Sequence, residues 1–131
     1  MPALGFKKEF AEAVENGEKR QTVRALRKDG RSHCKAGDTI KLYTGMRTTS
    51  CRLLGTAIVT NVCAVKIMDT GMELGGRLLP SVIYARDQHE LTDNEFAQAD
   101  GFDSFSDMTE WFTKNHGLPF EGVVIQWGEL R

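Results

Sequence analysis

The first part of the chain changes from a strand pattern to a helical pattern. Residues 3–6 form a short apolar run that predicts a strand. Apolar residues then recur at helical spacing through Phe10 and Val14, which predicts a helix over 7–16. Gly17 supplies the stop for this helix. We expect its aromatic side chains to belong to the core and not to a binding surface.

The middle of the chain carries mostly strand patterns. Ile40 and Leu42 alternate with polar residues, as on a half-buried strand. A longer apolar run is expected to bend or split near Asn61. Strands are predicted over 21–26, 39–44 and 52–65, with a loop over 28–37, a polar turn over 45–50 and a flexible loop over 70–81. The last loop is interpreted as either a lid or a plain connection.

Two helices and a closing strand are predicted in the last third. Thr92, with Glu95 three residues later, forms a capping box for a helix that runs through Ala99 and ends at Gly101. Ser104 caps a second helix, whose apolar stripe is expected to be core without a ligand. The stripe consists of Phe105, Met108, Trp111 and Phe112, and the closing strand is predicted over 122–127 after a break at 117–119.

The order of the predicted elements is β-α-β-β-β-α-α-β. This order favours an α+β domain with helices at the ends of a largely antiparallel sheet. The 131 residues, 40% hydrophobic and 27% charged, suit one compact domain over 1–131. No apolar run reaches the roughly 20 residues of a membrane span, and no signal-peptide pattern is present. We therefore expect a cytosolic protein without a cleaved leader and without a membrane partner.

The cysteines and histidines follow neither a disulfide pattern nor a metal-binding pattern. Cys34, Cys51 and Cys63 are odd in number and widely spaced, which argues against a disulfide framework and a structural zinc site. His33 and Cys34 would point to opposite faces of a strand, so they are poorly placed for proton transfer. The scattered histidines leave a composite metal site open but unsupported. We expect no metal and no cofactor.

Charge is divided along the chain, although the net charge is only −1. Residues 17–35 hold seven Lys and Arg against two acids, whereas 87–121 hold nine Asp and Glu against one Lys. This division fits a local anion site better than a nucleic-acid binder that uses its whole surface. Three of the cations are expected to be solvated loop residues, namely Arg27, Lys28 and Arg31.

The most informative stretch runs from Gly17 to Arg24. If residues 19–24 form a strand, Thr22 and Arg24 share a face, because side chains two apart point the same way. Lys19 lies at the turn from helix to strand. An ammonium, a hydroxyl and a guanidinium group then converge beside a helix end. The alternative is a solvated strand edge, the usual environment of Lys and Arg.

Three blocks of the chain, in order, resemble one family. The first carries the Gly-x-Lys-x-x-Thr-x-Arg signature of the ASCH superfamily on Gly17, Lys19, Thr22 and Arg24. The segment 32–38, Ser-His-Cys-Lys-Ala-Gly-Asp, resembles a Ser-His-x-Lys-x-Gly-Asp segment of bacterial N(4)-acetylcytidine amidohydrolases in that superfamily. The segment 97–102 and the helix after it resemble the late acidic segment and helix of the family.

The resemblance implies a single-domain PUA-like β-barrel with flanking helices. It also implies a metal-independent hydrolase that cleaves N(4)-acylated cytosine nucleosides to cytidine and a carboxylate. The family's catalytic lysine and threonine fall on Lys19 and Thr22, and its late glutamate falls on Asp100, one methylene shorter. Glu95 or Glu73 is the alternative acidic partner. Lys19 would deprotonate Thr22 or a water molecule, and Asp100 would protonate the leaving amine.

Three further residues are expected to contact the substrate, a small modified cytosine nucleoside. Arg24 or backbone N–H groups would stabilise the oxyanion. Tyr43 would stack on the base or pack at the rim of the barrel, and Lys41 on the same strand face would hold a ribose or phosphate. The alternative function is an RNA-binding module, with or without ribonuclease activity, since PUA-like domains commonly bind RNA and some ASCH proteins act on it.

Overall fold

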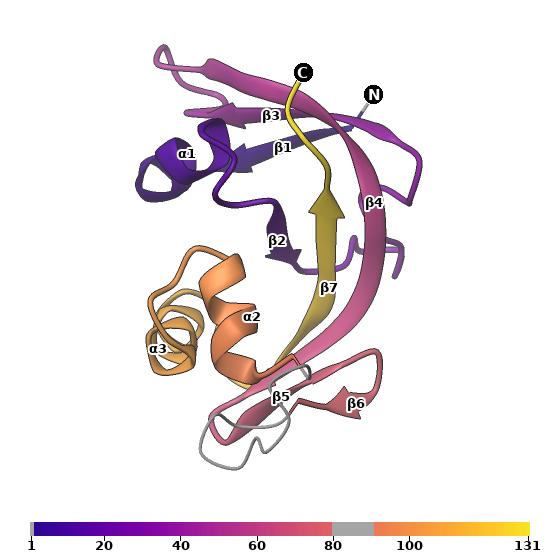
Figure 1. The fold of residues 1–131 in the computed structure, drawn as a ribbon, viewed down its shortest axis with the longest axis vertical. Helices are drawn as coiled ribbons and strands as arrows, with labels where there is room; N and C mark the ends of the chain where they lie inside the picture. Colours follow the sequence, from indigo (N-terminus) through magenta and orange to yellow (C-terminus); the bar gives the residue numbers. More distant parts are fainter. Residues whose placement is uncertain (1, 80–90) are drawn as a thin grey trace.

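The fold is α+β, as the sequence predicts (Figure 1). The computed structural model describes residues 2–79 and 91–131. No helix among these residues is both long and apolar enough to cross a membrane. The helices are α1 (Lys8–Glu15), α2 (Asp93–Ala99) and α3 (Phe105–Asn115). The strands are β1 (Ala3–Phe6), β2 (Gln21–Arg24), β3 (Thr39–Thr44), β4 (Arg52–Met68), β5 (Gly71–Leu74), β6 (Arg77–Leu78) and β7 (Phe120–Trp127).

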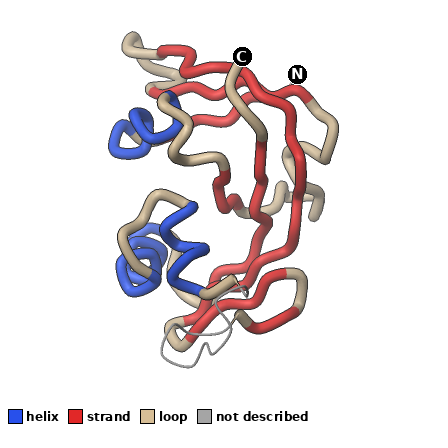
Figure 2. Tube along the Cα trace, viewed as in Figure 1, coloured by secondary structure: helices blue, strands red, loops and turns tan. Residues whose placement is uncertain are grey.

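The long strand β4 organises the sheet. Its first part pairs with β3, which pairs in parallel with β1. Its second part pairs with β5 and β7, and β7 pairs with β2. The register with β7 shifts between Val59 and Asn61, and such a bulge bends a strand. The bend expected near Asn61 is therefore confirmed, although β4 continues to Met68 as one arc (Figure 2).

The sheet is open, so the closed barrel that the resemblance implied is wrong. β1 pairs with β3 and β2 pairs with β7, but no pairing joins β1 to β2 in the described part of the chain. Both strands have only four residues, and β2 ends at Arg24, before the predicted residue 26. The Arg24 side chain crosses this open edge between β1 and β2. Its guanidinium donates a hydrogen bond to the Gly5 carbonyl oxygen and lies 5.0 Å from the Phe6 ring centre.

Two apolar clusters fill the molecule, one on each side of β2. The first lies under α1 and includes Leu4, Phe6, Val14, Ile40, Leu42 and Ile125. The second lies under α2 and α3 and includes Val23, Ile67, Met72, Phe96, Met108 and Phe112. Each fully buried side chain of this size contributes roughly 1.5–3 kcal/mol of transfer free energy. β2 therefore runs between two halves that are each packed separately (Figure 1).

The helix ends follow the signals in the sequence. The Thr92 hydroxyl accepts a hydrogen bond from the Glu95 N–H, and the Glu95 carboxylate accepts one from the Thr92 N–H, so the capping box is confirmed. Ser104 Oγ accepts from the Asp107 N–H at 3.1 Å and caps α3. After α1, Gly17 adopts a φ of +84°, a conformation that glycine reaches without steric cost.

The prediction of a flexible loop over 70–81 is wrong for most of this stretch. β5 and β6 form a hairpin that extends the sheet beyond β4. Gly75 and Gly76 adopt φ values of +61° and +82° at the turn, which suits a two-residue hairpin connection. The glycines therefore mark a tight turn and not a lid. The end of the predicted loop lies outside the described residues.

Candidate active site

The turn between α1 and β2 brings Lys19 into the interior. Its backbone N–H donates to the Ala13 carbonyl oxygen at 2.9 Å, which ties the residue to the end of α1. Gly101 lies against its aliphatic chain, since a Cβ at Gly101 would come within 3.4 Å of Lys19 Cδ. Lys19 is only 3% exposed. Such burial requires a partner, because an unpaired lysine is almost never fully buried.

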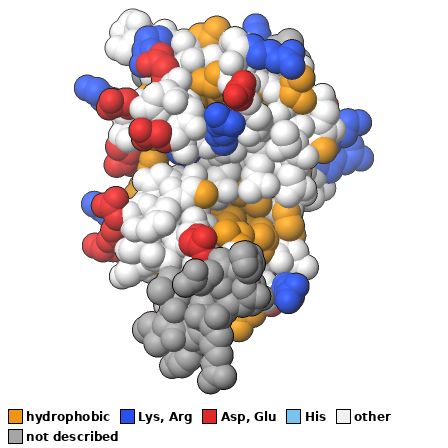
Figure 3. All heavy atoms as spheres, viewed as in Figure 1, with side chains coloured by type: hydrophobic (Ala, Val, Ile, Leu, Met, Phe, Trp, Pro, Cys, Tyr) orange, Lys and Arg blue, Asp and Glu red, His pale blue; other side chains and the backbone are white. Residues whose placement is uncertain are grey.

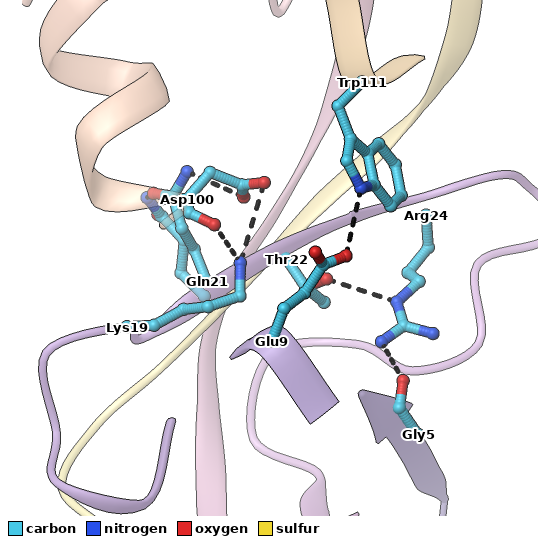
Figure 4. Close-up of polar contacts among 9 residues, drawn as sticks. Gly5, Glu9, Lys19, Gln21, Thr22, Arg24, Asp100 and Trp111 are labelled. Atoms are coloured by element: carbon cyan, nitrogen blue, oxygen red, sulfur yellow. Dashed lines mark hydrogen bonds and ion pairs between the residues drawn. The ribbon is translucent and has the colours of Figure 1, made fainter. Parts of the chain in front are cut away.

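Asp100, at the C-terminal end of α2, is that partner (Figure 4). Lys19 Nζ lies 3.6 Å from Asp100 Oδ2 and donates a hydrogen bond to the carbonyl oxygen of the same residue. The other carboxylate oxygen, Oδ1, accepts from Gln21 Nε2 at 3.3 Å. The Phe10 ring covers Nζ, with its centre 5.2 Å away. The structure thus brings together two residues that lie 81 positions apart in the sequence.

Burial changes the proton affinity of both partners. Desolvation lowers the pKa of Lys19 below its ordinary value, an effect that Asp100 opposes and Arg24 reinforces. Desolvation raises the pKa of Asp100, against the attraction of Lys19 and the Gln21 hydrogen bond. Both shifts favour the neutral forms, which are an amine that can accept a proton and a carboxylic acid that can donate one. General acid–base catalysis uses these two states.

Thr22 and Arg24 point to the same side of β2, and they contact each other. Arg24 Nε donates to Thr22 Oγ1 at 3.2 Å, and Thr22 is 6% exposed. We expected Lys19 to reach this hydroxyl. Among the described residues, the Thr22 hydroxyl instead accepts its hydrogen bond from Arg24, and Lys19 Nζ donates to Asp100. A guanidinium at this distance stabilises negative charge on Oγ1 or on an oxygen beside it.

A cavity of about 240 Å³ connects these two pairs. This volume is slightly smaller than ~300 Å³, the lower end of the usual range for small-molecule pockets. Lys19, Thr22, Arg24 and Asp100 supply polar groups to its lining. Much of the remaining wall is aromatic and comes from Phe6, Phe10, Phe102, Trp111, Phe112, His116 and Phe120. Apolar walls with a few convergent polar groups are typical of sites for small molecules.

Contacts between α1 and α3 hold the aromatic wall in place. Trp111 Nε1 donates to Glu9 Oε1 at 3.3 Å (Figure 4). Lys7 Nζ donates to Asn115 Oδ1 at 2.9 Å and lies 4.9 Å from the Trp111 ring centre. Trp111 packs against the second apolar cluster, as expected for the α3 stripe, but it is only partly buried and also lines the cavity.

Sequence reasoning missed the aromatic wall because helical spacing alone does not separate a core ring from a cavity ring. Phe10 and Trp111 both follow the apolar face of their helices, yet both are only half-buried. Phe102 and Gly101 belong to the third motif block itself. The available signal was the concentration of aromatic residues beside the motif blocks.

Lys41 and Tyr43 are not brought to the site. Neither is among the described residues that line the cavity. On β3 they alternate with Ile40 and Leu42, which are fully buried in the core. The side chains of Lys41 and Tyr43 therefore point to the other face of the sheet. Their expected roles as substrate-binding residues are corrected on this ground.

The two alternative acidic residues also lie elsewhere. Glu95 is exposed, and its carboxylate takes part in the α2 capping box. Glu73 lies opposite Lys66 in the pairing of β5 with β4. Neither lines the cavity among the described residues. Of the three acidic candidates, Asp100 is the one that reaches Lys19.

The second motif block lies in the connection from β2 to β3. The Lys35 N–H donates to Asp38 Oδ2 at 2.9 Å, and the Asp38 carbonyl accepts from the Val59 N–H at 2.8 Å, so the block anchors this connection to β4. Cys34 is buried. Desolvation raises the pKa of its thiol, and the nearby Asp38 charge raises it further, so the thiol is a poor nucleophile. The three cysteines are free thiols.

No cluster of metal ligands is found in the ranges 2–79 and 91–131, where no three His, Cys, Asp or Glu side chains group together.

Comparisons with known proteins give no family for the chain. No protein-family model, no curated protein and no solved structure matches it. The chemistry of the site and the motif blocks are therefore the basis for a functional proposal.

Proposed function

We propose that this protein is a hydrolase that cleaves the amide on the exocyclic nitrogen of N(4)-acylated cytosine nucleosides. The observation that carries the proposal is the buried Lys19–Asp100 pair in a cavity that also holds Thr22 and Arg24. A base, an acid and an anion-binding group are then available in one place. The three motif blocks further support a PUA-like domain of the ASCH superfamily, here with an open sheet.

The cavity wall supports a planar aromatic substrate. Bases stack on aromatic side chains with about 1–3 kcal/mol per base, and Phe10, Phe102 and Trp111 pack edge to face or at a tilt around this wall. A volume of about 240 Å³ suits a pyrimidine with a short acyl group. We expect the ribose to remain at the opening of the cavity.

The proposed reaction balances within the Lys19–Asp100 pair. The neutral Lys19 amine takes a proton from a water molecule, whose oxygen attacks the acyl carbon. Arg24 stabilises the tetrahedral oxyanion. Asp100, in its acid form, gives its proton to the exocyclic nitrogen as the C–N bond breaks, which releases cytidine and a carboxylic acid. The proton on Lys19 then passes to the Asp100 carboxylate and restores both neutral groups.

Thr22 has two possible roles in this reaction. As a nucleophile, Oγ1 would form an ester that water hydrolyses in a second step. As a positioning group, the hydroxyl would orient the attacking water while Arg24 holds it. The geometry favours the second role, because Thr22 Oγ1 accepts a hydrogen bond from Arg24 and Lys19 is engaged with Asp100.

The direct test is incubation of the purified protein with N(4)-acetylcytidine and measurement of released cytidine. We expect release in excess chelator, and loss of release in Lys19→Ala. Lys28→Ala is the matched control, since Lys28 is exposed in the loop after β2. No turnover by the native protein would overturn the proposal. Chelator-sensitive activity that zinc restores would overturn the metal-independent mechanism.

RNA binding is the second candidate, and one observation favours it. The loop between β2 and β3 exposes a group of cations, namely Arg27, Lys28, Arg31 and Lys35. Figure 3 shows cationic side chains at the right-hand edge, on the side of this loop, and many acidic side chains on the side of the helices. Phosphate groups bind to such exposed cations. RNA and nucleosides both occur in the cytosol, the location expected for this chain.

A further inference from the structure

Three amide side chains form a row across the sheet that ends at Asp100. Asn61 on β4, Gln126 on β7 and Gln21 on β2 are neighbours in the strand registers. Asn61 Nδ2 donates to Gln126 Oε1 at 3.2 Å, and Gln126 Nε2 donates to Gln21 Oε1 at 3.2 Å. Gln21 Nε2 then donates to Asp100 Oδ1 at 3.3 Å. The row connects an exposed residue to a buried carboxyl group.

Oδ1 of Asp100 fixes the direction of this row. With the acid proton on Oδ2, Oδ1 accepts a hydrogen bond in both the acid and the carboxylate form, so Gln21 turns its NH₂ group toward Asp100 and its carbonyl oxygen toward Gln126. Gln126 then donates to Gln21 and accepts from Asn61. Each amide therefore presents a donor in the direction of Asp100. Hydrogen bonds aligned in one direction polarise and strengthen one another.

We propose that Gln21 is a positioning residue for the acid step, in which it holds Asp100 Oδ1 and leaves Oδ2 facing Lys19. Gln126 and Asn61 hold Gln21 in turn. Gln21 is buried, and it is not among the described residues that line the cavity, so it acts through Asp100 and not on the substrate. Its catalytic consequence rests on the proposed function, but its effect on Asp100 does not.

The groups around Asp100 determine the direction of the expected effect. Two charged groups act on the Asp100 carboxyl group. They are Lys19, in the turn between α1 and β2, and Arg24, at the end of β2. Both favour the carboxylate, as does the Gln21 hydrogen bond, whereas desolvation favours the acid. Removal of the Gln21 donor therefore shifts Asp100 toward the acid.

Gln21→Met tests this, because it keeps the side chain length and removes both hydrogen bonds. The Asp100 carboxyl carbon is titrated by NMR, with Asp100→Asn to assign the resonance. We expect the midpoint to rise by about one pH unit. Gln98→Met is the matched control and should leave the midpoint unchanged, since Gln98 is exposed on α2 and donates to the Asp103 carbonyl oxygen.

Gln126→Met is a second variant that keeps the Gln21–Asp100 contact and removes its support. It should give a smaller shift in the same direction. An unchanged midpoint in folded Gln21→Met overturns the proposal. If Gln21→Met does not fold, an unchanged midpoint in Gln126→Met overturns it equally.

Activity separates this proposal from the proposed function. With N(4)-acetylcytidine, the pH profile of kcat in Gln21→Met should shift by the same amount at nearly constant KM. A native protein that titrates as expected without turnover overturns the hydrolase and keeps the effect of Gln21 on Asp100. Turnover with an unshifted profile in Gln21→Met overturns the positioning role and keeps the hydrolase.

Discussion

Lys19 and Asp100 depend on each other because each is buried in an environment that disfavours its charge. Removing one partner of a buried pair typically costs about 3–5 kcal/mol, since the other charge is left uncompensated. A carboxyl or amine left alone in this way changes its protonation state. Substitutions at this pair should therefore be visible in stability as well as in activity, and their effect on stability should depend on pH.

Lys19→Met is expected to lose stability relative to the native protein as the pH rises. Without Lys19, the desolvated Asp100 loses the attraction that opposes its raised pKa, so this pKa rises further. Above the ordinary Asp pKa of 3.8, the unfolded chain releases a proton that the folded variant retains, and rising pH therefore favours unfolding. The difference in melting temperature should grow between about pH 4 and 8. A difference independent of pH would contradict the pairing.

Asp100→Asn should lower kcat by about 10²–10⁴-fold, the usual effect of losing a general acid or base. If Asp100 served only to end α2, where it is the C-cap, the change would be nearly silent in kcat. Asp100→Glu places at this position the glutamate that the resemblance implies, and it should keep activity. Its extra methylene lengthens a buried side chain that already contacts Lys19 and Gln21, which should cost about 1–3 kcal/mol of stability. Steady-state kinetics with thermal melts measure both effects.

Thr22→Val removes the hydroxyl that Arg24 contacts and keeps the shape of the side chain. If a water molecule attacks the substrate, loss of this positioning hydrogen bond should lower kcat by roughly tenfold. If Thr22 is the nucleophile, activity should fall to the level of Lys19→Ala. Thr113→Val is the control, because Thr113 is exposed on α3 and its hydroxyl donates to the Thr109 carbonyl oxygen.

At the scale of elements, the sequence predicted helix ends well, because neighbouring residues determine them. The Thr92–Glu95 capping box depends on residues close in sequence. The bend of β4 near Asn61 was expected from its own run, although the register shift there is made against the distant strand β7. The β5–β6 hairpin was missed because its glycines were interpreted as flexibility, although a hairpin turn uses the same residues. The Lys19–Asp100 contact could be predicted only through the resemblance, because no local period links residues so far apart.

Gly101→Ala is the prediction for the connection between α2 and α3. Gly101 has a φ of +102°, and a Cβ there would lie 3.2 Å from Phe10 Cδ1 and 3.4 Å from Lys19 Cδ. The backbone strain should cost roughly 1 kcal/mol or more, and a shift of the Phe10 ring, which covers Lys19 Nζ, should lower kcat as well. Gly30→Ala isolates the backbone strain, because Gly30 has a φ of +80° and no atom within 4 Å of the added Cβ. This control should keep its kcat.

At the scale of the whole molecule, the division of charge gives a test of RNA binding. If RNA is a ligand, its affinity should fall with salt, with a slope of roughly −0.7 per phosphate contact for a single strand. Glutamate at Arg27, Lys28 and Arg31 should weaken binding and flatten this slope. Lys114→Glu on the acidic side is the control. Salt-insensitive or undetectable binding in fluorescence titrations would leave the small-molecule function alone.

The open edge between β1 and β2 has a consequence for access to the cavity. In a closed barrel every strand is held by two neighbours, so widening the interior breaks several backbone hydrogen bonds. Here the Arg24 side chain crosses the gap to Gly5 where strand pairing is missing, and the β4 bulge provides a point of bending between the halves. Gly5, Phe6 and Arg24 also line the cavity. At this edge of the described structure, access to the cavity is therefore limited by side-chain contacts and not by a backbone ladder.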